Sequence, residues 1–141
     1  MLAFEANSTI VATPDKVWGI LVQGAEWPNW DSGVASVDGT IALGKKLKIQ
    51  SKVAPGRTFP VKVTKFAGPG SLEFTGGMPL GLFKGVRTYT LTADKSGGTL
   101  FTMREEYTGP LAGSIGKSIP DLNPSFVQFA NGLKSKVESG K

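Results

Sequence analysis

Apolar and polar residues alternate with a period of two through the middle of the chain. In the segment 45–53, Leu47 and Ile49 fall on one face and lysines on the other, which is typical of a half-buried strand. Four more segments with strand character follow, over 59–66, 71–77, 83–93 and 98–108. The connections are short and rich in Gly, Pro, Asp and Ser, so the pattern predicts consecutive antiparallel hairpins.

The start of the chain predicts a strand followed by two short helices. Residues 4–12 form the strand, with Phe4, Ala6, Ser8 and Ile10 on one face. Thr13 and Pro14 are good residues to begin a helix, and Gly24 is suited to end it. A second short helix or 3₁₀ turn at about 28–32 and a strand at about 34–38 follow.

The end of the chain predicts one long amphipathic helix. Phe126, Phe129, Leu133 and Val137 recur at steps of three and four, which indicates a helix over about 120–138. A separate helical turn is expected at about 111–118. Its small residues either let this segment approach the sheet or leave room for a ligand.

The order of these elements predicts an α+β architecture within a single domain, residues 1–141. We expect a curved antiparallel sheet of about seven strands wrapped around the C-terminal helix. One helix fills a wide concave sheet poorly, so this arrangement favours an internal cavity for a small molecule.

The composition excludes several kinds of chemistry. The chain has no Cys and no His, which excludes disulfide scaffolds, thiolate or histidine metal sites and Ser-His-Asp triads. Asp, Glu, Lys and Tyr remain for acid–base chemistry. We therefore expect neither a metal nor a cofactor.

The charge balance favours a solvated surface over nucleic-acid recognition. Lys plus Arg is 16 against 11 for Asp plus Glu, and only Arg57, Arg87 and Arg104 are arginines, the residue that recognition of bases and phosphates favours. The outward lysines 46, 48, 52 and 62 form a solvated face or, alternatively, a seat for an anionic membrane or nucleic acid. We expect no transmembrane helix, no signal peptide and a cytoplasmic location.

The last hairpin places an ion pair inside the sheet. If its turn centres on Ser96, Arg87 faces Glu105 and Tyr89 faces Met103, on the face that also carries Leu91 and Phe101. The pair could fix the register, or it could anchor a ligand carboxylate or phenolate through Arg87. A slip of one residue would instead place both side chains in solvent.

Two further features each have a structural and a functional interpretation. Trp27 and Trp30 either plug one end of the core or form an aromatic pocket wall. The apolar segment 76–83 either folds over the core or forms a lid hinged at its glycines 76, 77 and 81; a contact between two copies of the chain is a third interpretation.

Five motifs together resemble one superfamily. They are TPDKVW at 13–18, Trp-Pro-x-Trp-Asp at 27–31, LGKKLKIQ at 43–50, REEYTGPLAG at 104–113 and SFVQFANGLK at 125–134. In this order they resemble the helix-grip fold of the START-like (SRPBCC) superfamily, in its polyketide cyclase/dehydrase and lipid-transport branch. The resemblance implies a ligand cavity between the sheet and the last helix.

The function expected first is binding of a small hydrophobic or amphipathic ligand, either lipid-like or aromatic and polyketide-like. Arg87 and Glu105 are the expected polar pair, and the other expected contacts are Trp30, Ile49, Phe59, Val61, Phe74, Phe83, Tyr89, Met103, Tyr107, Ile115 and Phe126. Two alternatives remain. One is a cofactor-free cyclase/dehydrase-type enzyme in which Glu105, Tyr89 or Tyr107 moves a proton. The other is a structural or partner-binding domain whose cavity is filled by its own side chains.

Overall fold

A seven-stranded antiparallel sheet forms the body of the molecule. The computed structural model describes residues 2–52, 58–77, 79–117 and 121–139. The strands are β1 (Leu2–Ile10), β2 (Val34–Asp38), β3 (Lys46–Ser51), β4 (Phe59–Ala67), β5 (Ser71–Gly77), β6 (Lys84–Ala93) and β7 (Thr99–Thr108). Their order across the sheet is β1-β7-β6-β5-β4-β3-β2. The predicted meander is therefore confirmed, and the first strand joins it beside the last.

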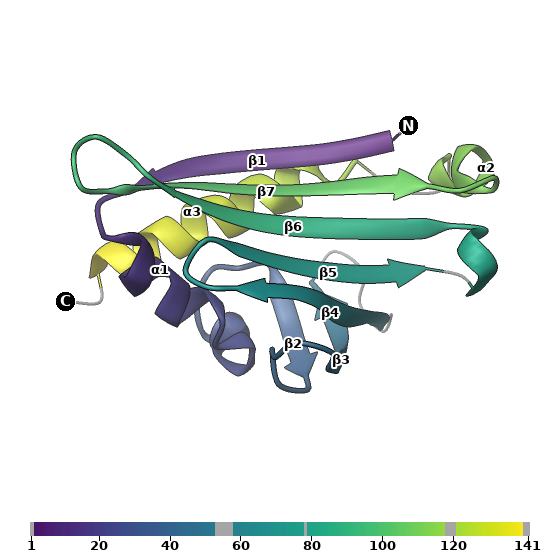
Figure 1. Cartoon of the computed structure of the whole chain (residues 1–141), viewed down its shortest axis with the longest axis horizontal. Helices are drawn as coiled ribbons and strands as arrows, with labels where there is room; N and C mark the ends of the chain where they lie inside the picture. Colours follow the sequence, from purple (N-terminus) through teal and green to yellow (C-terminus); the bar gives the residue numbers. More distant parts are fainter. Residues whose placement is uncertain (1, 53–57, 78, 118–120, 140–141) are drawn as a thin grey trace.

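One long helix and several short ones accompany the sheet. They are α1 (Pro14–Leu21), α2 (Ala112–Gly116) and α3 (Asn123–Ser139), with the 3₁₀ segments η1 (Gly24–Asn29) and η2 (Pro79–Gly81). Figure 1 shows α3 across one face of the sheet, with α2 and η2 at the end that holds the N-terminus. We call this the α2 end; α1 lies at the opposite end. None of the described helices has the length and apolar character needed to cross a membrane.

Local sequence signals place most element boundaries. The Thr13 side chain caps α1 by accepting a hydrogen bond from the Lys16 amide at 3.4 Å. The second short helix was predicted at 28–32 but lies at 24–29. Trp27 is fully buried and its Nε1 donates to the Leu21 carbonyl at 2.9 Å, which holds this turn close to α1. Val53 and Pro120, at the ends of a predicted strand and helix, lie outside the described residues.

The concave face of the sheet and α3 share an aromatic core. Phe4, Ala6, Ser8 and Ile10 are all buried along β1, and the Ser8 hydroxyl donates to the Ala130 carbonyl of α3 at 2.9 Å. We call the buried rings at the centre the central aromatic cluster: Trp27, Phe74, Tyr89, Phe101 and Phe129. Neighbouring centroids in this cluster lie as close as 4.9 Å, between Trp27 and Phe129. Side chains of the protein thus fill the space beneath the middle of α3.

Candidate functional site

The last hairpin has the predicted register. Arg87 lies opposite Glu105, Tyr89 opposite Met103 and Leu91 opposite Phe101. Arg87 donates to Glu105 through Nε at 3.1 Å and through Nη2 at 3.3 Å. The side chain of Arg87 is 24% exposed and that of Glu105 is 13% exposed. The two-point ion pair therefore lies between the sheet and α3, but near the surface of the protein. The alternative register, with both residues in solvent, is wrong.

Aromatic rings surround this ion pair. The Tyr107 hydroxyl donates to Glu105 Oε2, and the Phe126 ring of α3 lies 4.9 Å from the Arg87 guanidinium carbon. Phe83 stacks on Tyr107 with centroids 5.4 Å apart. We call Arg87, Glu105 and Tyr107 the polar cluster. It lies on β6 and β7, under the first turn of α3.

Burial and charge set the protonation of the groups around the pair. Burial works against the Arg87 charge, but Glu105 and the Tyr89 hydroxyl outweigh burial and raise the pKa of Arg87. Burial, followed by the Glu105 charge, raises the pKa of Tyr107. Burial also raises the pKa of Tyr89, although the Arg87 charge opposes it. Arg87 therefore stays charged, and both phenols stay protonated at neutral pH.

Two buried polar atoms lack a hydrogen-bond partner in the described part of the chain. They are the Tyr89 hydroxyl oxygen, beside Arg87, and Trp30 Nε1. Both groups carry a hydrogen to donate. Leaving a buried donor unpaired costs about 1–3 kcal/mol, so these two atoms are an exception that packing alone does not explain.

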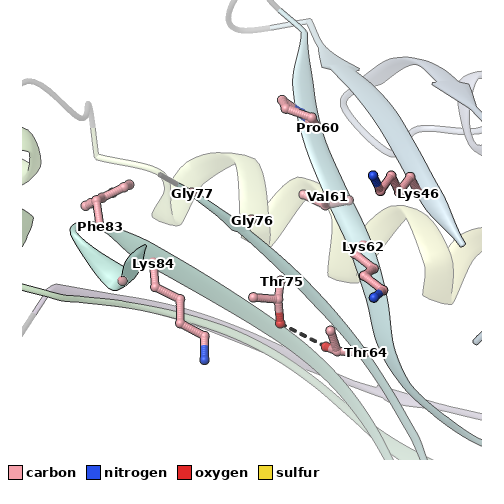
Figure 2. Close-up of a pocket in the computed structure, with 11 residues that line it drawn as sticks. Lys46, Pro60, Val61, Lys62, Thr64, Thr75, Gly76, Gly77, Phe83 and Lys84 are labelled. Atoms are coloured by element: carbon pink, nitrogen blue, oxygen red, sulfur yellow. Dashed lines mark hydrogen bonds between the residues drawn. The ribbon is translucent and has the colours of Figure 1, made fainter. Parts of the chain in front are cut away.

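Open space in the described structure lies at the α2 end. A pocket of about 630 Å³ is lined by Leu2, Tyr107, Thr108, Gly109, Ala112, Gly113 and Lys117. A second pocket, of about 460 Å³, opens between β4 and β5 and is shown in Figure 2. No residue of α3 lines either pocket. Neither of these two pockets is the expected cavity between the sheet and α3, and that cavity stays a prediction.

The predicted contact residues fall into three groups. Phe83, Arg87, Glu105, Tyr107 and Phe126 come together at the α2 end, as described above. Trp30, Phe74, Tyr89 and Met103 are buried in or beside the central aromatic cluster. Four further residues lie on elements other than those that carry the polar cluster: Ile49 on β3, Phe59 and Val61 on β4, and Ile115 on α2.

Phe59 is more exposed than the other residues on its face of β4. It lies directly opposite Ile49 across the β3–β4 pair, on the inward face, but it is 41% exposed, whereas Val63 is fully buried. Pairing between β4 and β5 begins only at Lys62, so the first residues of β4 lack a neighbouring strand on that side.

The apolar segment 76–83 forms a turn at the α2 end. Leu80 is 95% exposed and has a φ of 63°, and the Leu82 carbonyl accepts a hydrogen bond from the Leu111 amide at 2.9 Å. This bond fastens the turn to the segment that leads into α2. Met78, part of the predicted lid, lies outside the described residues. The interpretation as a lid stays a prediction.

Leu2 was missed by the sequence analysis. The first strand was predicted to begin at residue 4, whereas β1 begins at Leu2, which pairs with Tyr107 and lines the larger pocket. Three residues give too short a pattern to reveal the alternation.

The described residues contain no group of His, Cys, Asp and Glu that could hold a metal ion.

Comparisons with known proteins agree with this fold. Residues 1–138 match the profile of the family described as polyketide cyclase / dehydrase and lipid transport. No curated protein resembles the sequence closely enough to count as a match.

Solved structures from several bacteria share the architecture. A Mesorhizobium loti protein has a TM-score of 0.74 at 18% identity, and the alignment covers 99% of both chains. A START superfamily protein from Mycobacterium smegmatis has a TM-score of 0.70 at 14% identity, again over 99% of both chains. At these identities the likeness shows the fold.

Proposed function

The chain belongs to the polyketide cyclase / dehydrase and lipid transport family, and on this premise we propose that it binds a small amphipathic ligand at the α2 end of the grip. The apolar part of the ligand lies in the larger pocket, and a ligand oxygen is held beside Arg87. The polar cluster orients the ligand, and burial of its apolar surface supplies most of the binding energy.

The unpaired Tyr89 hydroxyl is the observation that carries this proposal. It is fully buried and interacts with the Arg87 guanidinium, which can only donate, and none of the described residues accepts the hydrogen of the hydroxyl. Because its free group is a donor, the missing partner must offer an acceptor. A carboxylate, phenolate or carbonyl oxygen meets this requirement, and the positive charge of Arg87 favours the two anions.

The larger pocket supplies the apolar part of the site. The Tyr107 side chain lines this pocket, and its hydroxyl reaches Glu105, which in turn holds Arg87. Leu2, Ala112 and Gly113 add apolar and small surfaces on the other side. Tyr107 and Glu105 therefore connect the wall of this pocket to Arg87.

The test is a binding measurement on matched ligands and a matched variant. Calorimetry would compare the affinity for dodecanoate with that for dodecanol. It would also compare an aromatic hydroxy acid with the neutral compound in which both its phenol and its carboxyl group are methylated. We expect the anions to bind more tightly, and Tyr89→Phe to weaken anion binding about tenfold while leaving the neutral ligands almost unchanged, since it removes one donor and no bulk.

Two results would contradict the proposal. One is the absence of binding by every member of the panel, which would favour a domain whose interior is filled by its own side chains. The other is an equal effect of Tyr89→Phe on anionic and neutral ligands, since the hydroxyl would then not contact the ligand oxygen.

A second candidate function is a cofactor-free enzyme of the cyclase/dehydrase type. The observation that favours it is the hydrogen bond from Tyr107 to Glu105 at the edge of an open pocket. A carboxylate bonded to a phenol can pass a proton to or from a bound substrate. Glu105→Gln should abolish turnover of a reactive polyketide chain and leave its affinity nearly unchanged. Loss of affinity together with turnover would identify Glu105 as a binding or structural group instead.

The proposal also includes the cellular setting. We propose that the chain acts in the cytoplasm, without integral membrane association or a nucleic-acid partner, and as a monomer or a homodimer. Cell fractionation checks the first two statements, a DNA and RNA binding assay the third, and light scattering after size exclusion the last.

A further inference from the structure

A groove on the outer face of the sheet remains unexplained by the proposed function. It opens where the first residues of β4 and the last residues of β5 separate, as Figure 2 shows, with α3 behind the sheet. Lys46, Lys62 and Lys84 carry its charges. The remaining lining residues are Pro60, Val61, Thr64, Thr75, Gly76, Gly77, Gly81 and Phe83. Its volume is about 460 Å³.

The three lysines of this groove are not neutralised by the described residues. Lys46 lies directly opposite Lys62 across the β3–β4 pair, an arrangement of like charges that destabilises a sheet. Lys84 enters from β6, opposite Gly77. None of the three takes part in a salt bridge within the described ranges, and no carboxylate is among the described lining residues.

The two threonines that line the groove do not neutralise the charges of its three lysines. Thr64 donates to Glu73 Oε1 at 2.7 Å and shares a second hydrogen bond of 2.8 Å with Thr75. Glu73 is thereby held by Thr64, and it also lies opposite Lys65 across the β4–β5 pair. Glu73 is not among the residues that line the groove, and it takes part in no salt bridge with Lys46, Lys62 or Lys84.

The floor of the groove is apolar. Pro60, Val61 and Phe83 line it together with Gly76. A Cβ at Gly76 would come within 2.8 Å of the Pro60 carbonyl oxygen and 3.1 Å of Val61, so glycine keeps this part of the groove open. An occupant that matches both the rim and the floor combines a negative charge with a short apolar part.

We propose that this groove is a second binding site, for the anionic headgroup and first carbons of a single-chain amphiphile. The three ammonium groups hold the phosphate or carboxylate head, and Val61, Pro60 and Phe83 cover the carbons next to it. The site lies on the convex side of the sheet, and its charges belong to residues other than those of the polar cluster. Phe83 contacts both sites, since it lines this groove and stacks on Tyr107, but the groove can bind its ligand whether or not the proposed function holds.

The experiment titrates the protein with hexyl phosphate, inorganic phosphate and hexyl glucoside, followed by amide NMR. We expect hexyl phosphate to shift the amide signals of Thr64, Thr75, Gly76 and Gly77 and to bind more tightly than either other probe. Inorganic phosphate tests whether a free anion is sufficient for binding. Hexyl glucoside tests whether the hexyl tail without a negative charge is sufficient for binding. Shifts confined to Arg87, Glu105 and Tyr107 would locate the ligand at the other site and overturn this proposal.

A charge-matched pair of variants isolates the three lysines. K46Q/K62Q/K84Q should weaken hexyl phosphate binding by about tenfold or more, because each exposed ammonium contributes modestly at close range. K16Q/K95Q/K136Q removes the same charge from exposed positions on α1, the β6–β7 turn and α3, and should leave the affinity within about twofold. All six positions are exposed, so both variants should fold.

Two outcomes of this comparison would overturn the proposal. Equal weakening by both triple variants would mean that net charge alone attracts the probe. Equal affinity for inorganic phosphate and hexyl phosphate would mean that the apolar floor contributes nothing and that the site takes a free anion.

Discussion

At the residue scale, the Arg87–Glu105 pair combines favourable geometry with partial burial. The Glu105 side chain is 13% exposed in the intact pair, and among the described residues removal of Arg87 leaves Tyr107 as its one side-chain hydrogen-bond partner. Arg87→Leu should therefore lower the free energy of unfolding by about 1–3 kcal/mol, below the cost for a fully buried pair because solvent screens these groups. Urea denaturation measures this value.

The control for this prediction is Lys48→Leu. Lys48 is exposed on β3, and its replacement should change stability by no more than about 0.5 kcal/mol. The double variant R87L/E105L should recover part of the loss, since it leaves no unpaired charge. Equal urea midpoints for R87L and K48L would show that the ion pair contributes nothing to the fold.

The two tyrosines make a second prediction at this scale. Tyr89 and Tyr107 are the only tyrosines of the chain, and burial raises the pKa of both. The absorbance of tyrosinate near 295 nm should therefore stay low through about pH 10, where an exposed tyrosine is half ionised. It should rise together with unfolding.

The sign of the pH effect follows from the same shifts. A phenol whose pKa is higher in the folded state than in the unfolded state contributes stability that is present below about pH 10 and is lost as the pH rises above it. Tyr107→Phe should reduce this loss. A titration with a midpoint near pH 10 in the folded protein would contradict the burial of both hydroxyls.

The pairing of Arg87 with Glu105 was predictable because a short turn fixes the register of a hairpin. The Asp94 carboxylate accepts hydrogen bonds from the Ser96 and Gly98 amides, and Gly97 has a φ of 86°, so this turn is specified locally. The unpaired state of the Tyr89 hydroxyl was not predictable. It follows from the burial of the whole side chain, whose ring contacts four rings from different segments: Trp27, Phe74, Phe101 and Phe129.

At the element scale, two helical glycines should respond to Ala in opposite ways. A Cβ at Gly132 of α3 would lie 1.8 Å from the Asp31 carbonyl oxygen, whereas Gly19 of α1 is exposed with nothing within 4 Å. Gly132→Ala should lower stability by about 1–3 kcal/mol, since α3 must move away from the segment after η1. Gly19→Ala should raise stability by about 0.5–1 kcal/mol.

Thermal and urea unfolding of both variants check this pair. If Gly132→Ala stabilises the protein as Gly19→Ala does, α3 does not approach the Asp31 carbonyl as closely as described.

The strands were easier to predict than the short helices. Alternation over five to ten residues defines β3, β5 and β7, because one face of each packs on the core. The position of η1 depends instead on one tertiary contact, the burial of Trp27, which local turn residues do not encode. In β4 a bulge between Val63 and Lys65 changes which face later residues occupy, and it brings Phe66 against Trp18 at 5.2 Å.

At the scale of the whole molecule, the two ends of the grip should differ in stability. The α1 end borders the central aromatic cluster, whereas the α2 end holds a helix of five residues, exposed Gly113 and Ser114, and the larger pocket. Amides of α2 should exchange with deuterium through local opening, and those of Tyr89 and Met103 only through global unfolding. Hydrogen exchange followed by NMR measures both.

A bound ligand should slow hydrogen exchange more at the α2 end than at the α1 end. Dodecanoate at a hundred times its dissociation constant should add about 2.7 kcal/mol to global stability and slow exchange in α2 at the same time. Uniform exchange rates at the two ends would contradict the difference, and slowing confined to the α1 end would place the ligand elsewhere.

The position of β1 beside β7 has a consequence for synthesis on the ribosome. Ile10 pairs with Thr99, so the first strand waits for a partner translated about ninety residues later, roughly 5–20 s at cellular elongation rates. The Ser8 hydroxyl also needs the Ala130 carbonyl, which emerges later still. The nascent chain must therefore keep β1 unpaired until β7 and α3 have been made, and a product that stalls before them would present that strand to chaperones and proteases.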